Sequence, residues 1–377
     1  MHQCKLELYS KDVQEIIYGL VKIYDEYCSN IIIYGSAAQN KLTYRRINGK
    51  IEFFSDMEFY VVPKSKINEN NKAFNKMLMN KSFEFLNGMS NLISIPFIDV
   101  YSVAKSFFSE SEARISTYEL KNNGIVLKGE NLLSSLVEID KFSYNPKIQN
   151  IEIVKGLKIL LLGSYNWYFI NRDYSDEEKK MFYYFLSSSF LNLLRTLLPY
   201  VGEFKLSNEE RVELLDDLTI RERILLYFSQ NIISQFKLIL EDKTNCRFSY
   251  AIDELFIIVF EGYMSMLSML LDCAEDEIVS KIDENKNTVF YGSKEKVNLL
   301  AQLSKFFVLA LNCVKQSMLE DDIHDEIINS LIKSFDVLME CKNQSLFGLS
   351  NLDKLSKIVG QYEELEKVRW RIIGSKD

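Results

Sequence analysis

Two short segments of the chain carry residues whose types and spacing could do chemistry. Gly35-Ser36 ends an apolar run, and a later apolar run carries Asp56 and Glu58, with Met57 between them. Because side chains alternate across a strand, we expect both carboxylates to project from one face, where a divalent metal ion would offset their repulsion. A Gly-Ser turn from strand to helix offers backbone N–H groups and a hydroxyl, which suit a phosphate.

A third carboxylate lies within another apolar run. Asp99 is flanked by Ile98 and Val100, and a buried strand carboxylate without a partner would be costly. We expect it to lie on a strand near the one that carries Asp56 and Glu58. Three carboxylates on neighbouring strands can hold two Mg²⁺ ions, which activate an attacking oxygen and neutralise the charge of a leaving pyrophosphate.

In this order the residues resemble the signature of the nucleotidyltransferases of the DNA polymerase β superfamily. That signature is Gly-Ser, a short helix, a strand with Asp-x-Asp or Asp-x-Glu, and an acid on a later strand. The Ser-Asp-x-Glu form that begins at Ser55 looks most like the antibiotic nucleotidyltransferases that modify aminoglycosides. The resemblance covers about residues 10–130, and its matching residues are Gly35, Ser36, Asp56, Glu58 and Asp99.

The resemblance implies a Mg²⁺-dependent enzyme that moves a nucleoside monophosphate from a nucleoside triphosphate, with ATP expected, to a hydroxyl of a small-molecule acceptor. Asp56 and Glu58 would bind the metal that carries the triphosphate. Asp99 would share a second metal ion and help to deprotonate or position the acceptor hydroxyl. Gly35 and Ser36 would hold the β- and γ-phosphates.

The chain departs from the family in the segment between the two halves of the motif, which is longer than usual. Residues 37–50 are expected to form an extra loop that carries Arg45 and Arg46. This loop could shape substrate access, contact the triphosphate or be a solvated excursion. Lys155 and Lys158, on the first long helix, could also reach a triphosphate, although a surface role is favoured.

Two alternative functions keep the same fold. In the first, the acceptor is a protein side chain, an RNA end or a second nucleotide in signalling or defence. In the second, the protein is a catalytically inactive nucleotide-binding or scaffold protein. Loss of the acids would mark the inactive form, and all three acids are present, so this alternative ranks last.

The periodicity of apolar residues predicts an α+β protein. Helical spacing over 11–28 and 67–87, and strands over 30–35, 51–62 and 97–101, indicate a small mixed-sheet nucleotidyltransferase-like domain at residues 1–130. Residues 120–127 are typical of a hairpin or short strand. An all-helical bundle domain is expected at residues 131–377, with helices at roughly 150–172, 176–200, 208–216, 219–241, 249–274, 294–319, 321–342 and 351–372.

Charge and histidine content narrow the chemistry. Residues 1–150 hold 18 Lys and Arg against 17 Asp and Glu, whereas the rest of the chain holds 27 against 36. A mildly acidic second half argues against a long nucleic-acid partner and fits a small cationic substrate or a protein better. With His2 and His324 alone, a Ser-His-Asp arrangement or a histidine-based zinc site is nearly excluded.

Targeting and redox signals favour a cytoplasmic protein. The N-terminus lacks the layout of a signal peptide. No membrane span is expected, because Glu261 interrupts the apolar stretch 255–271, which is better interpreted as a buried helix. Six well-separated cysteines without metal-ligand spacing indicate reduced core thiols, at Cys4, Cys28, Cys246, Cys273, Cys313 and Cys341.

Overall fold

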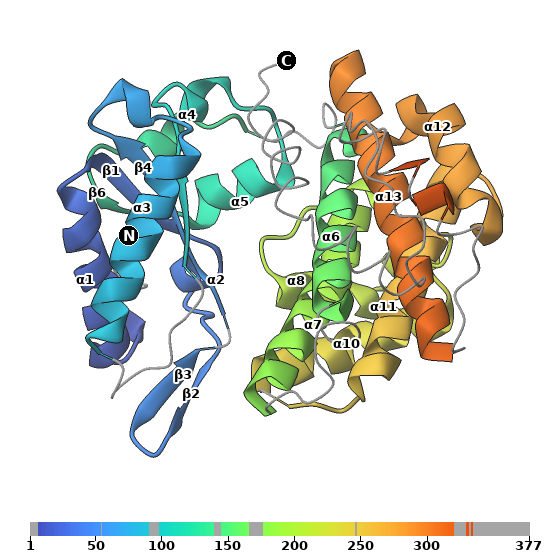
Figure 1. The fold of residues 1–377 in the computed structure, drawn as a ribbon, viewed down its shortest axis with the longest axis horizontal. Helices are drawn as coiled ribbons and strands as arrows, with labels where there is room; N and C mark the ends of the chain where they lie inside the picture. The colour runs from blue at the N-terminus through green and yellow to red at the C-terminus, as the bar shows by residue number, and fades with distance from the viewer. Residues whose placement is uncertain are drawn as a thin grey trace. The chain divides into compact units, whose positions relative to one another are not determined.

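A computed structural model of the chain gives an α+β fold (Figure 1), as the sequence predicts, with a small mixed sheet followed by helices. The chain divides into two compact units, Met1–Tyr144 with Thr244–Cys246 and Asn145–Lys243 with Arg247–Asp377. The structure describes residues 7–53, 55–89, 98–138, 145–165, 176–245, 247–319, 329–331 and 333–334.

Within its described residues, the first unit has a sheet of four strands in the order β5-β4-β1-β6. Strand β1 runs antiparallel to both of its neighbours, whereas β4 and β5 run parallel. A parallel pair needs a crossover connection, and helix α3 lies between β4 and β5 along the chain. The strands are β1 (Cys28–Tyr34), β4 (Met57–Pro63), β5 (Ile98–Ser102) and β6 (Ile125–Lys128).

Helices cover both faces of this sheet because β1 alternates between two sets of buried side chains. Ile31 and Ile33 pack on the face covered by α1 and α3, which lie side by side (Figure 1). Ile32 and Tyr34 pack on the other face with residues of α4, α5 and the 3₁₀ helix η3. These elements are α1 (Lys11–Asp25), α3 (Lys72–Asn87), α4 (Phe107–Glu110), α5 (Ile115–Asn123) and η3 (Leu132–Ser135).

The prediction of one strand over 51–62 is wrong, because the segment forms two strands. Its first part, β3 (Lys50–Phe53), pairs with β2 (Tyr44–Ile47) in a ribbon that projects from the first unit (Figure 1). Asn48 and Gly49 join the two strands with φ of 50° and 80°. This left-handed pair is what a two-residue hairpin turn requires, so the expected extra loop is largely a hairpin.

Residues 120–127, predicted as a hairpin or short strand, end a helix and begin a strand. Helix α5 ends at Asn123 and β6 begins at Ile125. Gly124 joins them, and a Cβ there would lie 2.4 Å from the carbonyl oxygen of Leu120. Glycine therefore allows the chain to turn tightly from the helix into the sheet.

The first unit extends beyond the division that we expected after residue 130. Leu132, Leu133 and Leu136 are buried in the cluster that covers one face of the sheet, so the segment that follows β6 belongs to the same core. The compact unit accordingly reaches Tyr144.

The second unit is built from helices around one apolar core. The helix predicted over 294–319 matches α13 at both ends. The helix predicted over 321–342 lies largely outside the described residues, and the one predicted over 351–372 lies wholly outside them. Its helices of six or more residues are α6 (Ile151–Tyr165), α7 (Asp176–Leu197), α8 (Asn208–Glu213), α9 (Leu218–Ile224), α10 (Gln230–Asn245), α11 (Ile252–Leu271), α12 (Ile278–Val289) and α13 (Lys294–Leu319).

The helices of this unit differ from the prediction in two places. The single helix expected over 219–241 is α9 followed by α10, because the hydroxyl of Ser229 accepts a hydrogen bond from the N–H of Ile232 and starts a new helix. Helix α12 was not predicted, since it is mostly polar and only Ile278, Ile282 and Val289 are buried.

Within the described residues, α11 and α13 are long and apolar enough to cross a membrane by length and composition alone. That is weak evidence, because the core helix of a globular unit passes the same test. Leu255 of α11 and Phe306 of α13 are fully buried in the core.

Cys28 and Cys313 are buried thiols whose pKa is raised by burial to about 12.

Candidate functional site

The register of the sheet places two of the three predicted acids side by side. Glu58 of β4 pairs with Asp99 of β5 on one side and with Tyr34 of β1 on the other. Residues paired across strands point to the same face, and neighbouring strands are about 4.8 Å apart. Two carboxylates so arranged repel each other, and a cation beside them relieves the repulsion.

The backbone of Gly35 lies directly against the carboxylate of Glu58. Gly35 follows β1 with a φ of 69°, and a Cβ there would lie 2.2 Å from Glu58 Oε2. Both the positive φ and the close approach favour glycine at this position. The fold therefore brings the Gly-Ser turn and the second acid of the motif into contact, although they are far apart in sequence.

Ser36 presents a buried hydroxyl that has no hydrogen-bond partner within the described part of the chain. A buried polar atom without a hydrogen-bond partner costs about 1–3 kcal/mol. A ligand that bonds to the Ser36 hydroxyl would remove that cost. The turn itself is tied down by Tyr9. The Tyr9 hydroxyl donates to the carbonyl of Ala37 at 3.0 Å and accepts from the N–H of Leu42 at 3.2 Å, and burial raises its pKa.

Asp56 lies one residue before the start of β4 and is half-buried, as Glu58 is. The buried Met57 between them fits the predicted alternation. Ser55 is buried and bonds twice to Thr43: its hydroxyl accepts from the Thr43 N–H at 2.9 Å, and its own N–H donates to the Thr43 carbonyl at 3.3 Å. The chain that leads into Asp56 is thus fixed by the base of the hairpin.

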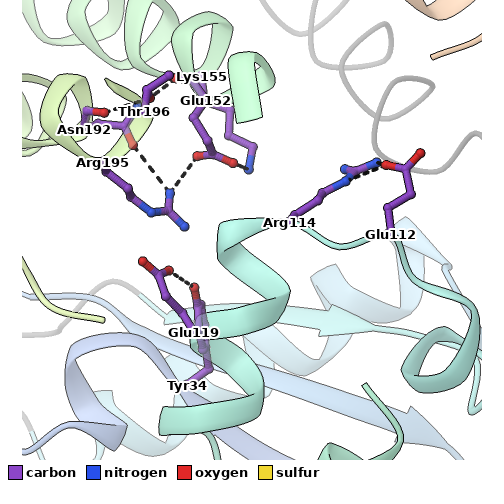
Figure 2. Close-up of polar contacts among 9 residues, drawn as sticks. All are labelled: Tyr34, Glu112, Arg114, Glu119, Glu152, Lys155, Asn192, Arg195 and Thr196. Carbon is purple, nitrogen blue, oxygen red and sulfur yellow. Dashed lines mark hydrogen bonds and ion pairs between the residues drawn. The ribbon is translucent and has the colours of Figure 1, made fainter. Parts of the chain in front are cut away.

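Two tyrosines that the sequence analysis did not single out contact acids in this region. The hydroxyl of Tyr101 donates to Asp99 Oδ2 at 3.2 Å, and that of Tyr34 donates to Glu119 Oε2 at 2.9 Å (Figure 2). Tyr101 follows Asp99 at i+2 on a strand, so the alternation rule was a signal for it. Glu119 had no such signal, because its contact depends on the position of helix α5.

Of the basic residues considered as triphosphate ligands, Arg46 and Lys155 contact carboxylates in the structure. Arg46 forms an ion pair with an aspartate of α1, and the side chain of Arg45 lies outside the described residues. Lys155 donates to Glu152 Oε1 at 2.6 Å. Lys158 is buried, so the surface role favoured for it is wrong.

A polar cluster in the second unit surrounds the buried Glu152 (Figure 2). Arg195 Nη1 donates to Glu152 Oε2 at 2.8 Å, so each carboxylate oxygen meets a cation. Asn192 Nδ2 donates to the Glu152 carbonyl at 2.8 Å, and Thr196 Oγ1 donates to the Asn192 carbonyl at 2.8 Å. The contacts that Arg195 and Asn192 make with Glu152 join α7 to α6, and the two cations account for a buried carboxylate inside an apolar unit.

The groups around Glu58 fit a hard cation and an anionic oxygen ligand. Carboxylate oxygens are the ligands that Mg²⁺ prefers, and Gly35 lets the Glu58 carboxylate approach its backbone. The buried Ser36 hydroxyl, which has no partner among the described residues, is available to a ligand. No three His, Cys, Asp or Glu side chains among the described residues lie close enough together to hold a metal ion. No protein-family model, curated protein or solved structure matches this chain.

Proposed function

We propose that the chain is a Mg²⁺-dependent nucleotidyltransferase, which moves a nucleoside monophosphate from a nucleoside triphosphate to a hydroxyl of a small-molecule acceptor. The observation that carries the proposal is the contact between Gly35 and the Glu58 carboxylate, with Glu58 in register with Asp99. A metal-bound triphosphate needs a glycine turn, a free hydroxyl and neighbouring carboxylates. The described residues supply these groups, with Ser36 as the hydroxyl.

In the proposed reaction the acceptor hydroxyl oxygen attacks the α-phosphorus and forms a new phosphoester bond. The bond from the α-phosphorus to the bridging oxygen breaks, and pyrophosphate leaves with that electron pair. The hydroxyl proton passes to a carboxylate, a role we assign to Asp99. Positioning and charge neutralisation account for most of the rate enhancement in such reactions.

We assign the binding of Mg²⁺ to Glu58 and Asp99, which are in register across β4 and β5, together with Asp56. Asp56 would have to move toward the pair when the ion binds, because no three such side chains are grouped among the described residues. The bound ion would neutralise charge on the phosphates. Ser36 and the N–H groups of its turn would bind the β- and γ-phosphates. Ser36 supports this role because its hydroxyl is buried without a partner among the described residues.

The test is transfer of label from nucleoside triphosphates labelled at the α-phosphate, with Mg²⁺ and with acceptors of separate classes. ATP, GTP, CTP and UTP would each be incubated with aminoglycosides, RNA, a second nucleotide or the protein alone. Label on the aminoglycoside supports the proposal, whereas label on RNA, on a dinucleotide or on the protein favours the first alternative. Absence of both turnover and nucleotide binding would overturn the assignment.

Glu58→Gln is the decisive variant, because it removes the charge at the contact with Gly35 and keeps the side-chain size. Turnover should fall by about 10²–10³-fold, the range seen when one charge-stabilising group is lost. Glu84→Gln is the matched control, since Glu84 is exposed on α3. Binding of nucleotide without turnover in the unaltered protein would instead favour an inactive nucleotide-binding protein.

A further inference from the structure

Asp99 receives a hydrogen bond from a side chain on its own strand. The Tyr101 hydroxyl donates to Asp99 Oδ2 at 3.2 Å, and both residues are half-buried on the same face of β5. Among the described residues, β5 is the terminal strand in the order of the sheet. Asp99 is therefore paired with Glu58 of the neighbouring strand on one side, and its carboxylate is held by Tyr101 of its own strand.

Packing holds the ring of Tyr101 independently of this hydrogen bond. Tyr101 pairs with Tyr60 of β4, and their ring centroids are 5.4 Å apart. The Tyr60 ring in turn stacks on Phe107 at 5.7 Å with an interplanar angle of 14°. Aromatic contacts of this kind favour one ring position, so the Tyr101 hydroxyl is held in place before any ligand binds.

We propose that Tyr101 is a positioning residue that orients the carboxylate of Asp99 toward a divalent cation. A donor on Oδ2 restrains rotation of the carboxylate and leaves the other oxygen as the principal ligand. Outer hydrogen bonds to metal ligands are typically worth about 10–100-fold in metal affinity or activity. This inference rests on the proposed function, because it concerns the same site.

The experiment measures Mn²⁺ binding in the presence of ATP, by titration followed with the electron paramagnetic resonance signal of free Mn²⁺. Four proteins form a double-mutant cycle: the unaltered chain, Tyr101→Phe, Asp99→Asn and the double variant. Tyr101→Phe keeps the ring and its packing and removes only the hydroxyl. It should weaken Mn²⁺ binding by about tenfold or more in the unaltered background, and should have no further effect beside Asp99→Asn.

Tyr18→Phe is the matched control, because it removes an exposed tyrosine hydroxyl from α1, which packs on the other face of the sheet. Its Mn²⁺ affinity should equal that of the unaltered chain. The same variants would be compared in thermal unfolding, where Tyr101→Phe should keep a single cooperative transition if the packing of its ring is preserved.

The outcomes separate this inference from the function on which it rests. If the unaltered chain binds Mn²⁺ with ATP and Tyr101→Phe binds it equally well, the role of Tyr101 is refuted and the proposed function stands. Equal weakening in both backgrounds refutes it too, because Tyr101 would then act without Asp99. If the unaltered chain binds no Mn²⁺ with ATP, the proposed function fails and the role of Tyr101 fails with it.

Discussion

Gly35→Ala is the substitution whose effects on stability and activity the structure predicts most specifically. The alanine Cβ would lie 2.2 Å from Glu58 Oε2, whereas ordinary contacts begin at 3.4 Å. The carboxylate must therefore move by about 1.2 Å, and it can, since it ends a flexible side chain. The φ of 69° adds strain, because the left-handed region costs an L-residue about 1–2 kcal/mol.

Two results are expected from Gly35→Ala, a modest loss of stability and a large loss of function. The free energy of unfolding should fall by about 1–2 kcal/mol because of the backbone strain. A displacement of about 1 Å at a reacting site can cost about 10²-fold in rate, so nucleotidyl transfer should fall by that factor. Urea unfolding followed by circular dichroism measures the first result, and the label-transfer assay measures the second.

Gly49→Ala is the control that isolates the contact from the strain. Gly49 has a φ of 80°, and a Cβ there would meet no atom within 4 Å. Both variants should lose similar stability, but only Gly35→Ala should lose activity. Equal activity losses in the two variants, or full activity in Gly35→Ala, would show that the approach of Gly35 to Glu58 does not matter for function.

Two further predictions concern a hydroxyl and a carboxylate. Ser36→Ala should leave the ligand-free protein as stable as the unaltered chain, or up to about 1 kcal/mol more stable, and should raise the KM for ATP. Ser82→Ala is the control and should destabilise the protein, because the Ser82 hydroxyl bonds to Tyr24 and to the Leu78 carbonyl. Equal losses of stability in the two variants would contradict this expectation. Glu152→Ala should lower the free energy of unfolding by about 1.5–3 kcal/mol, because it removes a buried carboxylate that bonds to two partly exposed cations; urea unfolding measures this loss. Lys281→Ala, in an exposed ion pair, is the control and should leave the midpoint unchanged. An equally small effect of Glu152→Ala would show that the cluster does not stabilise the helical unit.

Local patterns were enough to predict much of the fold. The apolar run of β1 and the spacing of apolar residues along α13 depend on burial of neighbouring side chains, and both appear where their patterns indicate. Errors arose where backbone conformation decided the outcome. The Asn48-Gly49 turn pairs β3 with β2, whereas β4 pairs with β1 and β5, yet the apolar residues of β3 and β4 together resemble one continuous strand.

The contacts of the candidate site also differ in whether a local pattern could predict them. The proximity of Asp99 to Tyr101 follows from strand periodicity alone. The approach of Gly35 to Glu58 depends on the register between β1 and β4, which no single segment specifies. Glu119 could not be found from the sequence, because it reaches Tyr34 only through the packing of α5.

The extra length between Gly35 and Asp56 does not separate the two halves of the motif. The inserted residues pair with each other as the β2–β3 hairpin, and the base of that hairpin is closed by the two hydrogen bonds between Thr43 and Ser55. Tyr9 ties the preceding turn to the chain that enters the hairpin. Since the cost of closing a loop grows only slowly with its length, a self-paired insertion clamped at its base leaves the register of β1 and β4, and with it the contact of Gly35 with Glu58, intact.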